Sequence, residues 1–269
     1  MSQIKFFKPN KIDLSNENIT LTVTDSAATS TGSDIIDFIR NRNNRSAWIT
    51  TGSADSGTTT IEIDMGDTES VDNIILIKHN WGSFTIQYWD GFAYTDFSTA
   101  INETTNTDET TAFSFTQVAT SKIKIVINGT QTADVDKELY QLIIGEQLGQ
   151  LEAYPIIKPK HVAGKKANKT LSGKFKIVEP VGRFSCVLDI KYLKSAADIN
   201  VIESLYFDRL PYLVWLGAGN ETQFSVAARG YRKEDIYLMR TTNDYRPDWY
   251  KGVYSTGLKL KIALDEVID

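Results

Sequence analysis

Between residues 46 and 149 the chain reads as a succession of short apolar–polar alternations separated by turn residues. In Thr59–Met65 the alternation places Ile61 and Ile63 on one face, the pattern of a strand with one buried side. Val71–Asn80 carries a continuous apolar run instead, which predicts a strand covered on both faces. Seven or more such strands predict an antiparallel β-sandwich or jelly roll, and the chain as a whole is expected to be mainly β.

A domain boundary is expected near Gly145–Lys160, where two glycines, two prolines and a change of charge sign coincide. Residues 1–145 hold 10 Lys and Arg and 19 Asp and Glu, whereas residues 146–269 hold 19 and 15. A chain of 269 residues is long enough for two ordinary domains. We therefore expect a sandwich with an N-terminal extension over 1–149 and a second β-rich domain, a barrel or sheet, over 150–269.

Two helices interrupt this β pattern. The spacing of Ile199, Ile202 and Leu205 predicts a helix near residues 195–206 within the second domain. A short helix is also predicted over Ser33–Asn43, because a serine stands at its N-cap position and arginines lie near its end.

Composition excludes several classes of protein. No apolar run approaches the roughly 20 residues that span a bilayer, and the N-terminus lacks the apolar core of a secretory signal. The single cysteine, Cys186, excludes an internal disulfide and is expected to be a buried strand residue. The acidic half is a poor partner for nucleic acid. Neither zinc-ligand spacing nor a nucleophile motif occurs, so we expect no enzyme and no cofactor. From the charge and the short apolar runs we expect no nucleic-acid binding and no membrane insertion.

Several pieces of the first half together resemble the discoidin or coagulation-factor C-type domain, a galactose-binding-like β-sandwich. They occur in the family's order and cover about two-fifths of the chain; they are Ala47-Trp48, Ile61–Gly66 followed by "VDNIILI", Phe84–Phe97, Ala119–Ile127 and "LYQLIIGE". The resemblance implies ligand binding, commonly of glycans, at loops on one end of the sandwich, sometimes beside a structural calcium.

Residues for such a site come from the loop after "ILIKHN", which supplies His79, Asn80 and Trp81. An exposed tryptophan stacks on the apolar face of a sugar, while Asn and His hydrogen-bond to its hydroxyls. Packing of Trp81 over the end of the sandwich is the alternative. Trp48 is expected in the core. Trp89 alternates away from the apolar face of its strand, so a partner could cover it.

Four aspartates are candidate calcium ligands: Asp55, Asp64, Asp67 and Asp72. Calcium takes about six to eight oxygen ligands, and no run of residues matches a calcium loop. Solvated acidic turns are therefore the favoured interpretation, and we expect no metal.

The second half is similar, more faintly, to tail-tip or baseplate (distal tail) proteins of tailed bacteriophages, through "RLPYLVWLG" and the closing "YSTGLKLKIALDEV". This resemblance implies a structural virion protein, made in the host cytoplasm, that forms a homo-oligomeric ring and contacts other tail proteins. Arg- and aromatic-rich loops are typical of protein interfaces. The expected interface residues are Trp89, Arg240, Tyr245, Arg246, Trp249 and Tyr250. The alternative is a carbohydrate-binding protein or accessory module that binds cell-surface glycans without catalysis.

Overall fold

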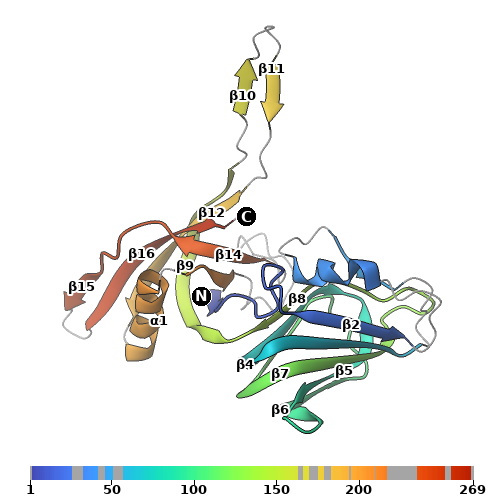
Figure 1. The fold of residues 1–269 in the computed structure, drawn as a ribbon. Helices are drawn as coiled ribbons and strands as arrows, with labels where there is room; N and C mark the ends of the chain where they lie inside the picture. The colour runs from blue at the N-terminus through green and yellow to red at the C-terminus, as the bar shows by residue number, and fades with distance from the viewer. Residues whose placement is uncertain are drawn as a thin grey trace. The chain divides into compact units, whose positions relative to one another are not determined.

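The computed structural model describes residues 2–25, 33–41, 46–50, 57–162, 166–169, 175–178, 183–193, 195–208, 210–216, 235–251 and 256–267. The chain forms two compact units. The sandwich unit is Pro9–Gln147, and the barrel unit combines Met1–Lys8 with Leu148–Asp269. Figure 1 shows strands dominating both units, which confirms the expected mainly β fold with one α-helix among the described residues.

The sandwich unit contains one seven-stranded sheet in the order β3-β8-β4-β7-β5-β6, with β2 paired to β4. Its elements are β2 (Thr20–Asp25), the 3₁₀ helix η1 (Ser33–Arg40), β3 (Trp48–Ile49), β4 (Thr59–His79), β5 (Trp81–Trp89), β6 (Tyr94–Glu103), β7 (Thr111–Thr130) and β8 (Glu138–Gly145). The strand pairs of this sheet, as far as the structure describes them, are antiparallel. The helix predicted over 33–43 is thus observed as a 3₁₀ helix that ends at Arg40.

Two long strands build the core of this unit. β4 and β7 pair along most of their length, with register shifts between Asp64 and Glu69 and between Val71 and Asn73. The first part of β4 pairs with β2 and the last part with β8, yet both parts contribute to one apolar cluster. The single sheet therefore folds over itself into a sandwich. Trp48 is fully buried in this cluster, as expected.

The barrel unit contains a second seven-stranded sheet in the order β12-β9-β1-β13-β14-β16-β15, and β12 also pairs with β16. This extra pairing closes six of the strands into a barrel. The elements are β1 (Ser2–Phe7), β9 (Gln147–Val162), β12 (Arg183–Leu193), α1 (Ala196–Phe207), β13 (Tyr212–Trp215), β14 (Ile236–Thr241), β15 (Asp248–Lys251) and β16 (Thr256–Glu266). A separate two-stranded sheet pairs β10 (Lys166–Lys169) with β11 (Phe175–Val178).

The structure places the N-terminal residues differently from the expected boundary. β1 pairs with β13, and Ile4 and Phe6 are buried in the barrel core rather than extending the sandwich. Cys186 lies in the same core, and burial raises the pKa of its thiol to about 12. Such a thiol stays protonated at neutral pH and is a poor nucleophile.

The predicted helix is α1, which begins after Ser195. The hydroxyl of Ser195 accepts a hydrogen bond from the backbone N–H of Asp198 at 3.0 Å, a regular N-cap. Val201, Ile202 and Leu205 are its buried residues. Among the described residues, no helix has the length and apolar character that crossing a membrane requires.

Candidate functional site

The tight connection between β4 and β5 places the predicted residues His79, Asn80 and Trp81. Only Asn80 separates the two strands, and Lys78 adopts a positive φ of 52° just before it. A Cβ on Gly82 would lie 2.8 Å from the carbonyl oxygen of Thr130, so glycine lets β5 start directly against the end of β7.

Trp81 is fully buried, and this corrects its expected role as a sugar-stacking residue. Its ring meets those of His79 and Phe84 edge-on, with centroids 5.3 and 5.7 Å apart. Because the indole faces are covered by protein atoms, they are not available to a sugar. The alternative expectation, packing over the end of the sandwich, describes Trp81 correctly.

His79 is buried as well and has a structural role in this geometry. The backbone N–H of Trp81 lies 3.2 Å from Nδ1, so Nδ1 accepts and Nε2 carries the proton that faces the Thr111 hydroxyl at 3.0 Å. Burial lowers the pKa of His79 to about 4. The imidazole is therefore neutral at pH 7 and its hydrogen bonds are already formed.

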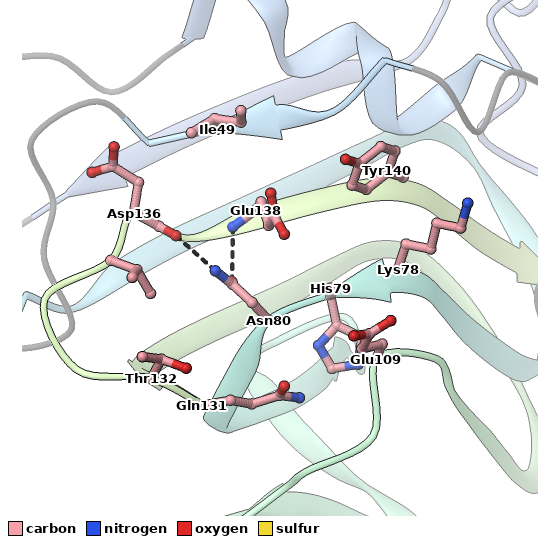
Figure 2. Close-up of a pocket in the computed structure, with 11 residues that line it drawn as sticks. Ile49, Lys78, His79, Asn80, Glu109, Gln131, Thr132, Asp136, Glu138 and Tyr140 are labelled. Carbon is pink, nitrogen blue, oxygen red and sulfur yellow. Dashed lines mark hydrogen bonds between the residues drawn. The ribbon is translucent and has the colours of Figure 1, made fainter. Parts of the chain in front are cut away.

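Asn80 braces the segment between β7 and β8. Its Nδ2 donates to the carbonyl oxygen of Asp136 at 2.7 Å, and its Oδ1 accepts from the N–H of Glu138 at 2.9 Å (Figure 2). The carbonyl of Asn80 also accepts from the N–H of Gln131 at 2.7 Å. Asn80 thus holds the wall of a site through its side-chain amide and its backbone carbonyl.

That wall encloses a hollow of about 620 Å³ at this end of the sandwich unit, a volume in the range of small-molecule sites. Figure 2 shows its lining side chains gathered from β3, β4, β8 and the segments on either side of β7. The lining residues are Ile49, Lys78, His79, Asn80, Glu109, Gln131, Thr132, Val135, Asp136, Glu138 and Tyr140.

Three of these side chains, Glu109, Glu138 and Lys78, keep charged groups available for a ligand. Within the described residues, the carboxylates of Glu109 and Glu138 make no hydrogen bond or ion pair, and Lys78 makes no ion pair. The Lys78 ammonium instead lies 5.7 Å from the centroid of the Tyr140 ring. Burial, and secondarily the charge of Glu109, raises the pKa of the Glu138 carboxyl. The hollow therefore combines two unpaired carboxylates, an aromatic ring and aliphatic surface from Ile49 and Val135.

Sequence reasoning predicts His79 and Asn80 as glycan-binding residues, and both line the hollow, but it does not predict Glu109, Glu138 or Tyr140. Glu138 and Tyr140 lie on β8, two positions apart, so both project from the same side of that strand. Glu109 comes from the segment before β7, where its carbonyl oxygen accepts from the N–H of His79 at 2.7 Å. No local motif joins these three residues, because they come together only through the pairing of β4 with β8 and the hydrogen bond between His79 and Glu109.

Trp89, an expected interface residue, lies at the end of β5 and is partly exposed. Its ring contacts that of Tyr94 at 5.3 Å, and the Lys124 ammonium lies 4.3 Å from the Tyr94 ring. The turn beyond it carries Phe92, which is 92% exposed. Asp90 fixes this turn, since its Oδ1 accepts from the N–H groups of residues 92 and 93.

The other expected interface residues lie in the barrel unit. Arg240 is exposed, and Arg246 forms an exposed ion pair with Asp244 at 2.8 Å. The Tyr245 ring contacts Tyr206 and Phe207 of α1, with centroids 5.2 and 5.5 Å apart. Trp249 and Tyr250 belong to β15, opposite Leu258 and Gly257 of β16, and their side chains lie outside the described residues.

The candidate calcium ligands that the structure describes do not share a site, because Asp64 and Asp72 have different partners. Asp64 forms an ion pair with Lys122 at 2.6 Å, and the Oδ1 of Asp72 accepts from the N–H of Gln147. Asp67 is exposed, and Asp55 falls outside the described residues. Among residues that are described, no group of three or more His, Cys, Asp or Glu side chains is placed to hold a metal ion.

No protein-family model matches the chain, and no curated protein matches it. Similar solved structures include chitosan-binding module 1 of a chitosanase/glucanase from Paenibacillus sp. IK-5, 18% identical over 50% of this chain and 97% of that one, with a TM-score of 0.38. Module 2 of that enzyme, in complex with chitotriose, is 18% identical over 48% and 97%, with a TM-score of 0.37. CpGH89CBM32-5 from Clostridium perfringens, in complex with GalNAc-β-1,3-galactose, is 14% identical over 49% and 97%, with a TM-score of 0.38.

Proposed function

We propose that the sandwich unit is a non-catalytic carbohydrate-binding module whose ligand occupies the hollow beside Asn80. The observation that carries this proposal is the pair of carboxylates, Glu109 and Glu138, that line the hollow and have no partner among the residues that the structure describes. Sugar hydroxyls are donors that such carboxylates accept from, and the apolar face of a sugar ring packs on aromatic and aliphatic side chains. Tyr140, Ile49 and Val135 supply that surface.

Hydrogen bonds and packing order the wall of the hollow, so the binding site is already formed before a ligand enters. Asn80 ties the segment before β8 to the β4–β5 connection through two hydrogen bonds, and His79 and Trp81 are packed beneath it. A site that is already ordered loses little conformational entropy when a ligand enters. We therefore expect only small backbone changes on binding.

The test compares two tyrosines on a glycan array probed with the full chain. Tyr140 and Tyr94 are both half-buried strand residues with a lysine ammonium over the ring, but only Tyr140 lines the hollow. Tyr140→Ala should abolish glycan binding, and Tyr94→Ala should leave it intact. Loss of binding in both variants with unchanged circular dichroism, or binding by neither variant nor the parent chain, would contradict the proposal.

A second candidate function concerns the barrel unit, which we assign as an assembly domain of a phage tail tip or baseplate that forms a homo-oligomeric ring in the virion. Two features support this function: the resemblance of residues 150–269 to phage tail-tip or baseplate proteins, and the apolar surface near the end of α1. Phe207 is 62% and Leu210 65% exposed, and Phe207 packs on Tyr245. Exposed apolar side chains beside aromatic ones are typical of protein interfaces.

Light scattering of the purified chain across a concentration series tests this second function. A ring-sized mass that falls to that of a monomer in Phe207→Ser and Leu210→Ser variants would support it. A monomer at every concentration would count against a self-assembling ring. The two functions belong to different units, so either result leaves the glycan test unaffected.

A further inference from the structure

The charges around the hollow are unbalanced. Glu109 and Glu138 line it with carboxylates, and Lys78 is the one lysine or arginine among the described residues that line it. Granting the proposed carbohydrate site, we infer that its ligand is cationic: a glycan of amino sugars whose amine is free rather than acetylated.

The two partnerless carboxylates come from different segments. Glu109 precedes β7, and Glu138 begins β8, so a group that enters the hollow meets one from each side. Burial and the charge of Glu109 both disfavour the ionised form of Glu138, as its raised pKa reflects. An ammonium placed between two carboxylates relieves that repulsion, whereas a neutral amide or an acidic sugar does not.

Lys78 contributes a cation of the protein itself to the hollow. Its ammonium lies over the Tyr140 ring at 5.7 Å, a cation–π contact. The positive φ of Lys78 is rare for a side-chain-bearing residue, and its N–H is held by the Thr110 hydroxyl at 3.2 Å. A ligand ammonium would compete with Lys78 for the Tyr140 ring and would be repelled by its charge, so removing this lysine should tighten binding of a cation.

Removing a glutamate should weaken binding of a cationic glycan, whereas removing Lys78 should tighten it. A variant that merely misfolds can only lose binding, so tighter binding cannot result from damage to the fold. Calorimetry with the full chain compares a glucosamine tetramer with the fully N-acetylated tetramer, which differs in charge but not in backbone. The variants are Glu138→Gln, Glu109→Gln and Lys78→Gln. Glu103→Gln is the control, since Glu103 belongs to the same unit but lies outside the lining.

The glucosamine tetramer should bind at least about 10-fold more tightly than the acetylated one, and Glu138→Gln should weaken it about 5–10-fold. Glu109 is exposed, so Glu109→Gln should weaken binding only about 2–5-fold. Lys78→Gln should tighten binding of the glucosamine tetramer and leave the acetylated one unchanged. Raising salt should weaken the charged tetramer alone, and Glu103→Gln should match the parent chain.

The outcomes that would overturn the inference also distinguish it from the proposed function. Equal binding of both tetramers, or binding of neutral glycans on an array but not of the glucosamine tetramer, removes the cationic specificity while the carbohydrate site stands. Binding of no glycan by a chain with an unchanged melting temperature removes both. Weaker binding of the glucosamine tetramer by the Lys78→Gln variant would also contradict the inference.

Discussion

Replacing Trp81 by phenylalanine tests whether this residue belongs to the core or to the ligand site. Trp81 is fully buried, and its indole N–H makes no hydrogen bond among the described residues. Leaving such a donor buried without a partner costs about 1–3 kcal/mol. Trp81→Phe removes that penalty, but it also removes apolar atoms whose burial contributes about 1–2 kcal/mol. The two changes oppose each other, so we expect a net change in the free energy of unfolding within about 1 kcal/mol.

Trp81→Ala provides the contrast, because it empties most of the volume that the indole fills. The rings of His79 and Phe84 then lose their edge-on partner, and a loss of about 3–5 kcal/mol is expected. Urea titration followed by circular dichroism measures both variants, with glycan binding measured on each folded sample.

Two results would refute this reasoning. If Trp81→Phe destabilises the chain as much as Trp81→Ala, the indole N–H has a partner that matters. If Trp81→Phe folds with the stability of the parent but loses glycan binding, the residue contacts the ligand after all.

Three further predictions concern stability. The pKa of His79 is about 4, below its ordinary 6.5, so the unfolded chain binds more protons than the folded chain between these pH values. The unfolding free energy should therefore fall by up to about 3 kcal/mol as pH drops from 6.5 to 4. A His79→Gln variant should lose this dependence of the unfolding free energy on pH. Arg40→Lys should cost about 1–3 kcal/mol in chemical denaturation, because the guanidinium donates to three backbone carbonyls within 12–16 and an ammonium cannot reproduce that geometry. Lys137→Met should cost about 1–3 kcal/mol and lower the melting temperature, because the buried ammonium donates to the carbonyl of Gly57 at 2.6 Å.

The strand pattern predicted most of the sandwich because alternation depends on local chemistry. Ile61 and Ile63 alternate and are buried, and the apolar run Ile74–Ile77 is covered on both faces, as expected. The sequence did not reveal that the two predicted strands are one long strand, β4, bent by register shifts. The sequence does not predict β1 either. Its six residues alternate little, and its partner β13 lies about 200 residues further along the chain.

The candidate site was only partly predictable. The sequence predicts His79 and Asn80 as glycan-binding residues. Both line the hollow and form hydrogen bonds within its wall, and their contact with a ligand stays a prediction. The exposure of Trp81 was misjudged, because a one-residue connection turns its side chain inward and no local pattern encodes that direction. Glu138 and Tyr140 escaped notice because solvated strand carboxylates and tyrosines are common, and only tertiary pairing distinguishes these two.

The central claim is that the hollow of the sandwich unit receives a sugar. A crystal structure of the full chain grown with the glucosamine tetramer tests it most directly. The account predicts electron density for a sugar ring packed on Tyr140, with its amine within hydrogen-bond distance of Glu109 and Glu138. Sugar density at another surface with the hollow free of it, at concentrations where calorimetry shows saturation, would contradict the account.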